Sequence, residues 1–277
     1  MENTHSEDGR LKRWGRLSPV WMIIGLVAVG AASTLAGAPA PVLPVVGAVL
    51  ALAAYWLVMK YVARREVPEI ARAGAARQAA SGVAMGLGFL LGSVALIAIL
   101  GGYSFTWGSG NLLWAVVSAA SVSLAGAVTE ELLFRGLALQ ALERMFGSGV
   151  AVAITAVFFG LVHLGNPGAT LWSSLAIAVE AGVLLGAGFL WRRSIWFVAG
   201  FHFAWNTTQT LLGIPTSGHE TGGILSAHAH GPAIWSGGDF GIEASIVPII
   251  VGAAIAVLML SRARREGRIV PMRRSRR

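Results

Sequence analysis

Long apolar stretches separated by short polar or basic connections run through the chain. A helix needs about 20 mostly apolar residues to cross the hydrocarbon core of a bilayer. Eight stretches approach or reach that length, over residues 19–36, 41–60, 79–101, 111–129, 149–165, 170–191, 194–212 and 242–261. This pattern predicts an all-α polytopic transmembrane bundle of about eight spans, with no sheet.

The fourth stretch continues through a polar motif to about residue 146. At about 1.5 Å per residue, a helix over 111–146 is too long to cross the bilayer upright. We therefore expect this helix to tilt strongly, to break, or to emerge along the membrane surface.

Basic residues occur in every second connection between the apolar stretches. They are found before residue 19, in 60–78, in 135–148, at Arg192 and Arg193, and in the tail from Arg262, which holds eight arginines. The connections 36–41, 101–111, 165–170 and 213–241 contain no Lys or Arg. Because cytoplasmic loops carry the excess of basic residues, both termini are predicted to be cytoplasmic.

The same pattern predicts how the chain is divided. We expect a cytoplasmic basic N-terminus (1–18), two spans with a basic cytoplasmic loop (19–78), a core (79–212), an outer loop (213–241), and a last span with a basic cytoplasmic tail (242–277). The start of the chain also resembles a cleavable signal peptide that ends near Ala36-Gly37-Ala38. Its apolar run is long for a signal, and cleavage would leave an odd number of spans. We therefore expect that this segment is not cleaved and forms the first span.

Composition narrows the class of protein. Of 277 residues, 55% are hydrophobic and 12% are charged, about half of the charged fraction of soluble proteins. The net charge of +8 does not indicate nucleic-acid binding, because the basic residues lie in short blocks between apolar stretches. These blocks are expected to contact anionic lipid head groups, above all in the tail. The preference for Arg over Lys, with abundant Ala, Gly and Val, is typical of a GC-rich prokaryotic genome and predicts a prokaryotic cell membrane.

The absence of cysteine excludes disulfides, thiolate metal sites and a cysteine nucleophile. Ionisable residues inside membrane spans are costly and are functional candidates by default. The chain has few, and they lie in the segments Thr129–Gly136, Phe159–His163 and His202–Asn206 and at Glu180.

Helical spacing predicts which of these side chains meet. Glu131 and Arg135 are four residues apart and share a helix face, so they should form an ion pair. Glu130 lies about 100° around the helix, where its i+4 neighbour is Phe134. A carboxylate without a counter-charge in an apolar site suits a general base. His202 and Asn206 also share a face, and an asparagine amide can donate to an oxyanion.

Each residue alone has a structural interpretation as well. Glu131 and Arg135 form a structural ion pair in that interpretation, and a single intramembrane histidine is a packed residue. Glu180 is expected to serve helix packing or hydrogen bonding. Two carboxylates, two histidines and an asparagine on three spans favour a common site instead.

Three motifs occur in order: Glu130-Glu131-x-x-x-Arg135, Phe159-x-x-x-His163 and His202-x-x-x-Asn206. Together they resemble the CAAX protease and bacteriocin-processing family (the CPBP or Abi family), over about residues 80–212. Members of that family are integral membrane endopeptidases related to the CAAX prenyl endopeptidase. Any one motif is weak, whereas three in order on membrane spans are specific.

The resemblance implies a hydrolase and a role for each residue. Glu130 would activate the attacking water, His163 and His202 would be the active-site histidines, and Asn206 would stabilise the oxyanion. Glu131, Arg135 and Phe159 would support the site.

The family is often called a metalloprotease family, but it lacks a clear zinc ligand set. Glu130, His163 and His202 can ligate a divalent metal such as zinc, or polarise a water directly, and the sequence leaves both open. No HExxH motif is present, which excludes the one-helix zincin mechanism.

The expected substrate is a membrane-associated peptide or protein. From a prokaryotic source, prenylated CAAX substrates would not be expected. Two other functions are open at this point: a non-proteolytic membrane scaffold or immunity factor, and a proton-coupled transporter using the same ionisable residues. The transporter is disfavoured because the polar residues cluster and no inverted repeat is visible.

Overall fold

All eight apolar stretches fold into helices in the computed structural model, which describes residues 17–36, 40–220 and 222–272. The basic N-terminal segment therefore lies almost wholly outside the described residues, as do residues 37–39 and the end of the tail. The first two stretches form α2 (Ser18–Ser33) and α3 (Val42–Leu57), which π-helix η1 (Val58–Val62) extends. The third forms α4 (Ala75–Ile99), after the short 3-10 turn η2 (Pro68–Ile70).

The remaining stretches complete the bundle. The fourth forms α5 (Leu112–Glu131), π-helix η3 (Leu132–Leu139) and α6 (Gln140–Phe146), and the fifth forms α7 (Ser148–Val162) with 3-10 turn η4 (His163–Gly165). The sixth forms α8 (Leu171–Ile177), π-helix η5 (Ala178–Val183) and α9 (Leu184–Arg192), and the last two form α10 (Ile195–Leu211) and α12 (Ile246–Arg265).

Six of these helical segments are long and apolar enough to cross a membrane. Two are shorter, with 16 residues in α2 and 17 in α10. Many large apolar side chains on the outer faces are exposed, among them Ile99, Val157 and Ile250. Such faces are expected where lipid tails rather than water surround the bundle.

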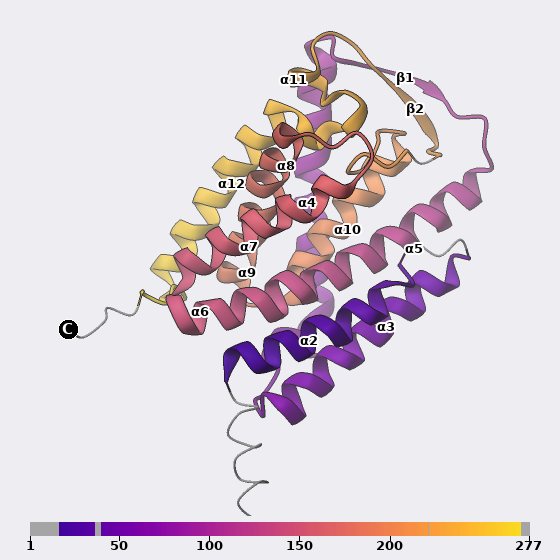
Figure 1. Ribbon diagram of the computed structural model, residues 1–277. Helices are drawn as coiled ribbons and strands as arrows, with labels where there is room; N and C mark the ends of the chain where they lie inside the picture. The colour runs from indigo at the N-terminus through magenta and orange to yellow at the C-terminus, as the bar shows by residue number, and fades with distance from the viewer. Residues whose placement is uncertain (1–16, 37–39, 221, 273–277) are drawn as a thin grey trace, which may run out of the picture.

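The long fourth stretch does not break. It forms one helix of 35 residues, Leu112–Phe146, which runs diagonally through the molecule (Figure 1). Eight residues in its second half, η3, are π-helical, and this segment begins directly after Glu131. Single π-helical turns inside α-helices frequently mark functional sites.

The expectation of no sheet was wrong. Strand β1 (Tyr103–Trp107) pairs with β2 (Leu225–Ala229) as an antiparallel two-stranded sheet. It lies at the end of the bundle opposite the C-terminus (Figure 1), and we call this the sheet end. The aromatic and β-branched residues of β1 favour a strand, but its partner follows more than 100 residues later.

The outer loop is folded over the sheet end. Besides β2 it contains α11 (Ala233–Ser236) and the 3-10 turn η6 (Gly238–Phe240), and the 3-10 turn η7 (Ile242–Ala244) follows directly after it. His228 and His230 of this loop are exposed and contact Thr106 and Ser104 of β1 through their Nε2 atoms, at 3.0 and 2.8 Å. These two histidines therefore bind the sheet together.

The core helix pair is α4 with α10, and glycines let the two backbones touch. A Cβ on Gly82 or Gly86 would meet the carbonyl oxygens of Phe197 or Phe201. Small residues permit this close approach of helices in membranes. The contact fixes α10, and with it the position of His202.

Candidate active site

Glu131 lies where two of the three motifs meet. Its Oε1 accepts a hydrogen bond from Arg135 Nη1 at 2.9 Å, which confirms the predicted ion pair. The same oxygen lies 2.9 Å from His202 Nδ1 on α10. Glu131 is fully buried, so both contacts are shielded from solvent. One carboxylate thus joins the first motif to the third.

Glu130 makes neither contact. Its side chain remains 33% exposed, and its Oε2 has no hydrogen-bond partner among the described residues. The imidazole of His202 lies close by, with its Nε2 3.9 Å from that Oε2. The structure therefore separates the adjacent glutamates as helical spacing predicts: Glu131 is engaged and Glu130 is open.

The hydrogen bonds assign the proton on both histidine rings. Nδ1 of His163 lies 2.6 Å from the carbonyl oxygen of Phe159, which can only accept, so Nδ1 carries hydrogen. Nδ1 of His202 donates in the same way to the carboxylate of Glu131. In a neutral imidazole the other nitrogen is then an acceptor. Both rings accordingly leave Nε2 available, and that of His202 faces Glu130.

The antiparallel packing of two consecutive helices brings Glu130 and His163 to one depth. The rings of Phe134 and Phe159 touch, with centroids 4.8 Å apart. Glu130 precedes Phe134 by four residues, and His163 follows Phe159 by four. Because the helices run in opposite directions, both residues lie one turn from this contact, toward the sheet end. Glu130 also lies near the middle of a 35-residue helix.

Phe159 pairs with both histidines. Its ring centroid lies 4.8 Å from that of His163 and 6.4 Å from that of His202. The Arg135 guanidinium stacks at 4.8 Å over the same ring. The supporting residue of the second motif thus packs against the other two motifs.

Asn206 lies one turn after His202 on α10 and is partly buried. Within the described part of the chain its amide has no hydrogen-bond partner. The spacing places it on the face that carries His202, where its amide is free to bind a substrate atom.

Arg135 also binds a second π-helix. Its Nη2 donates to the carbonyl oxygens of Ala181 and Gly182 in η5, at 2.8 and 3.2 Å. A π-helix changes the regular i to i+4 bonding and can leave carbonyl groups for other donors. The buried guanidinium is therefore bound by a carboxylate and by two backbone oxygens.

Glu180 lies in this π-helix and is fully buried. Both of its carboxylate oxygens are without a hydrogen-bond partner in the described ranges, which favours the packing alternative for this residue. The packing role holds, because the Glu180 backbone lies against Gly252 of α12.

Sequence reasoning did not single out Glu243, which the outer loop buries near both histidines. Its Oε2 accepts a hydrogen bond from the Ser217 backbone at 2.5 Å. Burial raises the pKa of the Glu243 carboxyl, while the Ser217 hydrogen bond and the nearby His163 and His202 lower it. An acidic residue at the second position of the last apolar stretch (242–261) was the available signal.

The donor set does not fit a metal ion. No group of three or more His, Asp or Glu side chains is placed to hold one in residues 17–36, 40–220 and 222–272. Glu130, His163 and His202 thus do not form the three-ligand set that catalytic zinc requires. We derive no step through a metal.

A family comparison agrees with the motifs. The model of the Rce1-like family, described as type II CAAX prenyl endopeptidase Rce1-like, matches residues 111–208. The match begins at α5, later than the expected start near residue 80, and contains all seven motif residues. No curated protein and no solved structure is significantly similar to the chain.

The match and the fold together settle the broad class. Six helices are long and apolar enough to span a membrane, and the matched family is a family of membrane peptidases. The protein is therefore a multi-pass integral membrane protein. Its residues 111–208, which carry the three motifs, are similar to the Rce1-like family, described as type II CAAX prenyl endopeptidase Rce1-like.

Proposed function

We propose that the protein is an intramembrane endopeptidase that uses a water activated by Glu130. Its substrate is a membrane-associated peptide or protein. The observation that carries the proposal is the 3.9 Å gap between Glu130 Oε2 and His202 Nε2. One water molecule can hydrogen-bond to both atoms across such a gap.

In the proposed reaction Glu130 takes a proton from this water, and the water oxygen attacks the carbonyl carbon of the substrate peptide. The new carbon–oxygen bond converts the carbonyl into a tetrahedral oxyanion. Breakdown of that intermediate cleaves the carbon–nitrogen bond, and the leaving amine receives the proton from Glu130. Such a transfer by a positioned carboxylate contributes about 10²–10⁴-fold to the rate.

The neighbouring residues have separate roles. His202 orients the water through Nε2, because Glu131 holds the proton on Nδ1. His163 is held in the same tautomer by Phe159 and orients the water from η4, directly after α7. Asn206 is the proposed oxyanion donor, since neutral His202 has no proton at Nε2 and the Asn206 amide is free. Arg135 fixes Glu131.

The proposed topology has eight spans with both chain ends in the cytoplasm. Basic connections gather at the end opposite the sheet, after α3, before α10 and after α12, whereas the sheet-end connections lack Lys and Arg. The positive-inside rule then makes the basic end cytoplasmic. A prokaryotic cell membrane is the proposed location.

Glu130→Gln tests the mechanism. This change keeps the shape of the side chain and removes the base, so peptide cleavage should fall by about 10²–10⁴-fold. Cleavage of a peptide library by the purified full-length protein in detergent is followed by mass spectrometry, and thermal unfolding reports folding. Because the Glu130 side chain makes no hydrogen bond through Oε2, the unfolding temperature should not change.

Glu266→Gln is the matched control, since Glu266 is exposed and lies after α12, far along the chain from the motifs. It should cleave as the unmodified protein does. Full activity of folded Glu130→Gln would refute the proposed role of Glu130.

A further inference from the structure

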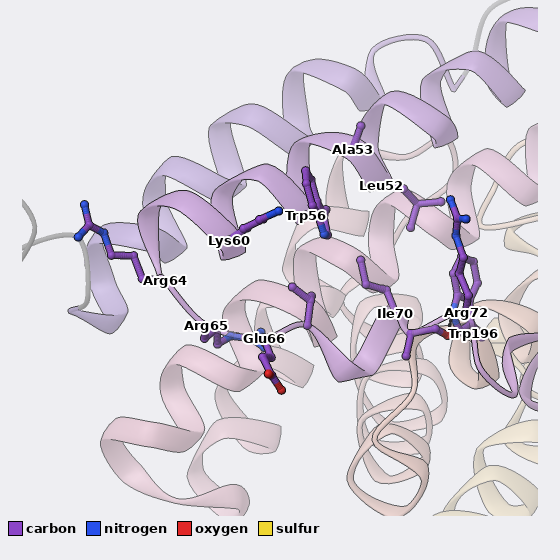
Figure 2. A pocket seen from close by; sticks show the side chains of 12 residues that line it. Leu52, Ala53, Trp56, Lys60, Arg64, Arg65, Glu66, Ile70, Arg72 and Trp196 are labelled. Atoms are coloured by element: carbon purple, nitrogen blue, oxygen red, sulfur yellow. Dashed lines mark hydrogen bonds between the residues drawn. The ribbon is translucent and has the colours of Figure 1, made fainter.

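A pocket of about 940 Å³ lies apart from the proposed active site. Its walls are the end of α3 with η1, the connection 64–72, and the start of α10 (Figure 2). None of the motif residues lines it. Its volume falls in the range of ligand-binding pockets.

The pocket carries excess positive charge. Lys60, Arg64 and Arg72 line it, and none of the three forms a salt bridge with any described residue. A fourth lining residue, Arg65, is paired with Glu69 at 2.6 Å. Glu66 is the one carboxylate among the lining residues. Cations thus outnumber carboxylates among the lining residues, and an anionic group is the complementary ligand.

The remaining wall is apolar and aromatic. Leu52, Ala53 and Ile70 line it together with Trp56 and Trp196. The ammonium of Lys60 lies 4.4 Å over the Trp56 ring, and Trp196 Nε1 donates to the Ala71 carbonyl at 3.0 Å. Figure 2 shows Lys60 beside Trp56, and Arg72 beside Trp196. An anion that also carries a hydrocarbon part would satisfy both kinds of wall.

The position of the pocket identifies the source of such a ligand. It opens beside α3, a membrane-spanning helix, at the basic end of the bundle, where tryptophans and cations meet. Tryptophan rings are typical of the membrane interface, and anionic lipids attract basic groups there. A diffusible anion would use the cations and would leave the apolar wall uncovered.

We propose that this pocket binds one anionic phospholipid of the surrounding leaflet. The phosphate lies between Lys60 and Arg72, and an acyl chain lies against Leu52 and Ile70. This proposal rests on membrane insertion and not on the peptidase mechanism.

The pocket is connected to the helices that form the proposed site. Arg65 and Glu69 bind Tyr55 and Gln140, and the Gly136 carbonyl of η3 accepts from both Tyr55 and Gln140. Trp196 lies on α10, which carries His202. A lipid held between these walls would therefore brace α3 against η3 and α10, so binding should raise the unfolding temperature.

The test uses the purified full-length protein, freed of lipid in detergent. Native mass spectrometry measures binding of phosphatidylglycerol, of phosphatidylcholine with matched chains, and of phosphatidylglycerol in the presence of millimolar inorganic phosphate. Thermal unfolding is measured with each addition. We expect phosphatidylglycerol to bind at least about tenfold more tightly than phosphatidylcholine, and phosphate not to displace it.

Three variants locate the lipid. Lys60→Gln/Arg72→Gln should weaken phosphatidylglycerol binding by about 10- to 30-fold. Ala53→Trp keeps every charge and fills the pocket from an exposed position, so it should also abolish tight binding. Arg264→Gln/Arg265→Gln removes the same charge from exposed positions at the end of α12 and should change binding by less than about twofold.

Each other outcome overturns the proposal. Undiminished binding by folded Ala53→Trp would place the lipid elsewhere, even if the double variant failed to fold. Equal losses in the two double variants would indicate a general charge effect. Displacement by inorganic phosphate would make the pocket a phosphate site.

Discussion

Glu131 contributes more to the proposed site than its spacing from Arg135 predicts. The i, i+4 relation predicts the ion pair, because it depends only on one helix. The bond to His202 depends on how α10 packs against α5, which no local pattern contains. Glu131 therefore fixes both the fold of its own helix and the tautomer of a histidine on another.

Arg135→Ala should damage the fold rather than the chemistry alone. It leaves Glu131 as a buried charge and removes the bonds to Ala181 and Gly182. Breaking a buried ion pair costs about 3–5 kcal/mol. We expect a clearly lower unfolding temperature in detergent. Arg264→Ala, at an exposed position, should unfold as the unmodified protein does, and an unchanged Arg135→Ala would contradict the structural role.

Glu69 makes stability depend on pH. Burial raises the pKa of its carboxyl, but hydrogen bonds and charge from Arg65 outweigh burial and hold the pKa below its usual value of 4.5. A carboxyl with a lowered pKa in the folded state stabilises the protein above the unfolded pKa. That contribution is lost as pH falls below 4.5 through the folded pKa.

Glu69→Gln should therefore cost about 3 kcal/mol at neutral pH, and the difference from the unmodified protein should shrink below pH 4.5. Unfolding temperatures measured between pH 7 and pH 3.5 check this expectation. Glu66→Gln, three residues earlier and with no salt bridge in the described structure, serves as control. A difference that stayed constant with pH would show that the carboxylate charge is not the cause.

At the scale of elements, the sequence pattern predicted the helices but not the π-helical segments within them or the two-stranded sheet. Each apolar stretch became a helix because membrane insertion satisfies backbone groups only in that way. The π-helices η3 and η5 are joined by the bonds from Arg135 to the Ala181 and Gly182 carbonyl oxygens, a contact between distant segments, and their sequences have the pattern of an ordinary helix. Strand β1 was missed because its five residues pair with a segment distant in sequence, and only the folded bundle brings β2 beside it.

The α4–α10 contact gives a test at this scale. A Cβ on Gly86 would meet the Phe201 carbonyl, whereas one on Gly88 would meet nothing within 4 Å. Overpacking costs about 1–3 kcal/mol, so Gly86→Ala should lower the unfolding temperature. It should also reduce cleavage, because α10 carries His202. Gly88→Ala should be neutral or stabilising, by up to about 1 kcal/mol. Equal behaviour of the two variants would mean that the close contact does not position α10.

For the whole molecule, the two ends of the bundle differ in chemistry. The sheet end is covered by the folded outer loop, which buries Glu243 near the histidines. The opposite end carries the basic connections and the proposed lipid pocket. The distribution of basic residues along the sequence predicted this difference between the two ends. It did not predict that the segment after α10 folds over the sheet end, because that fold depends on hydrogen bonds between distant residues, such as Asn166 with Ser217 and Trp172 with Ala244.

This polarity predicts which end faces the cytoplasm. A reporter fused after Arg277 should report the cytoplasm, because the connections near the end of α12 are the most basic of the chain. A reporter inserted near Gly231, an exposed residue of the outer loop, should report the outer side. Reporter activity is measured in cells with paired enzymes that are active on opposite sides of the membrane. Placement of both reporters on one side would contradict a crossing by α12, and a reversed pair would place the proposed lipid pocket in the other leaflet.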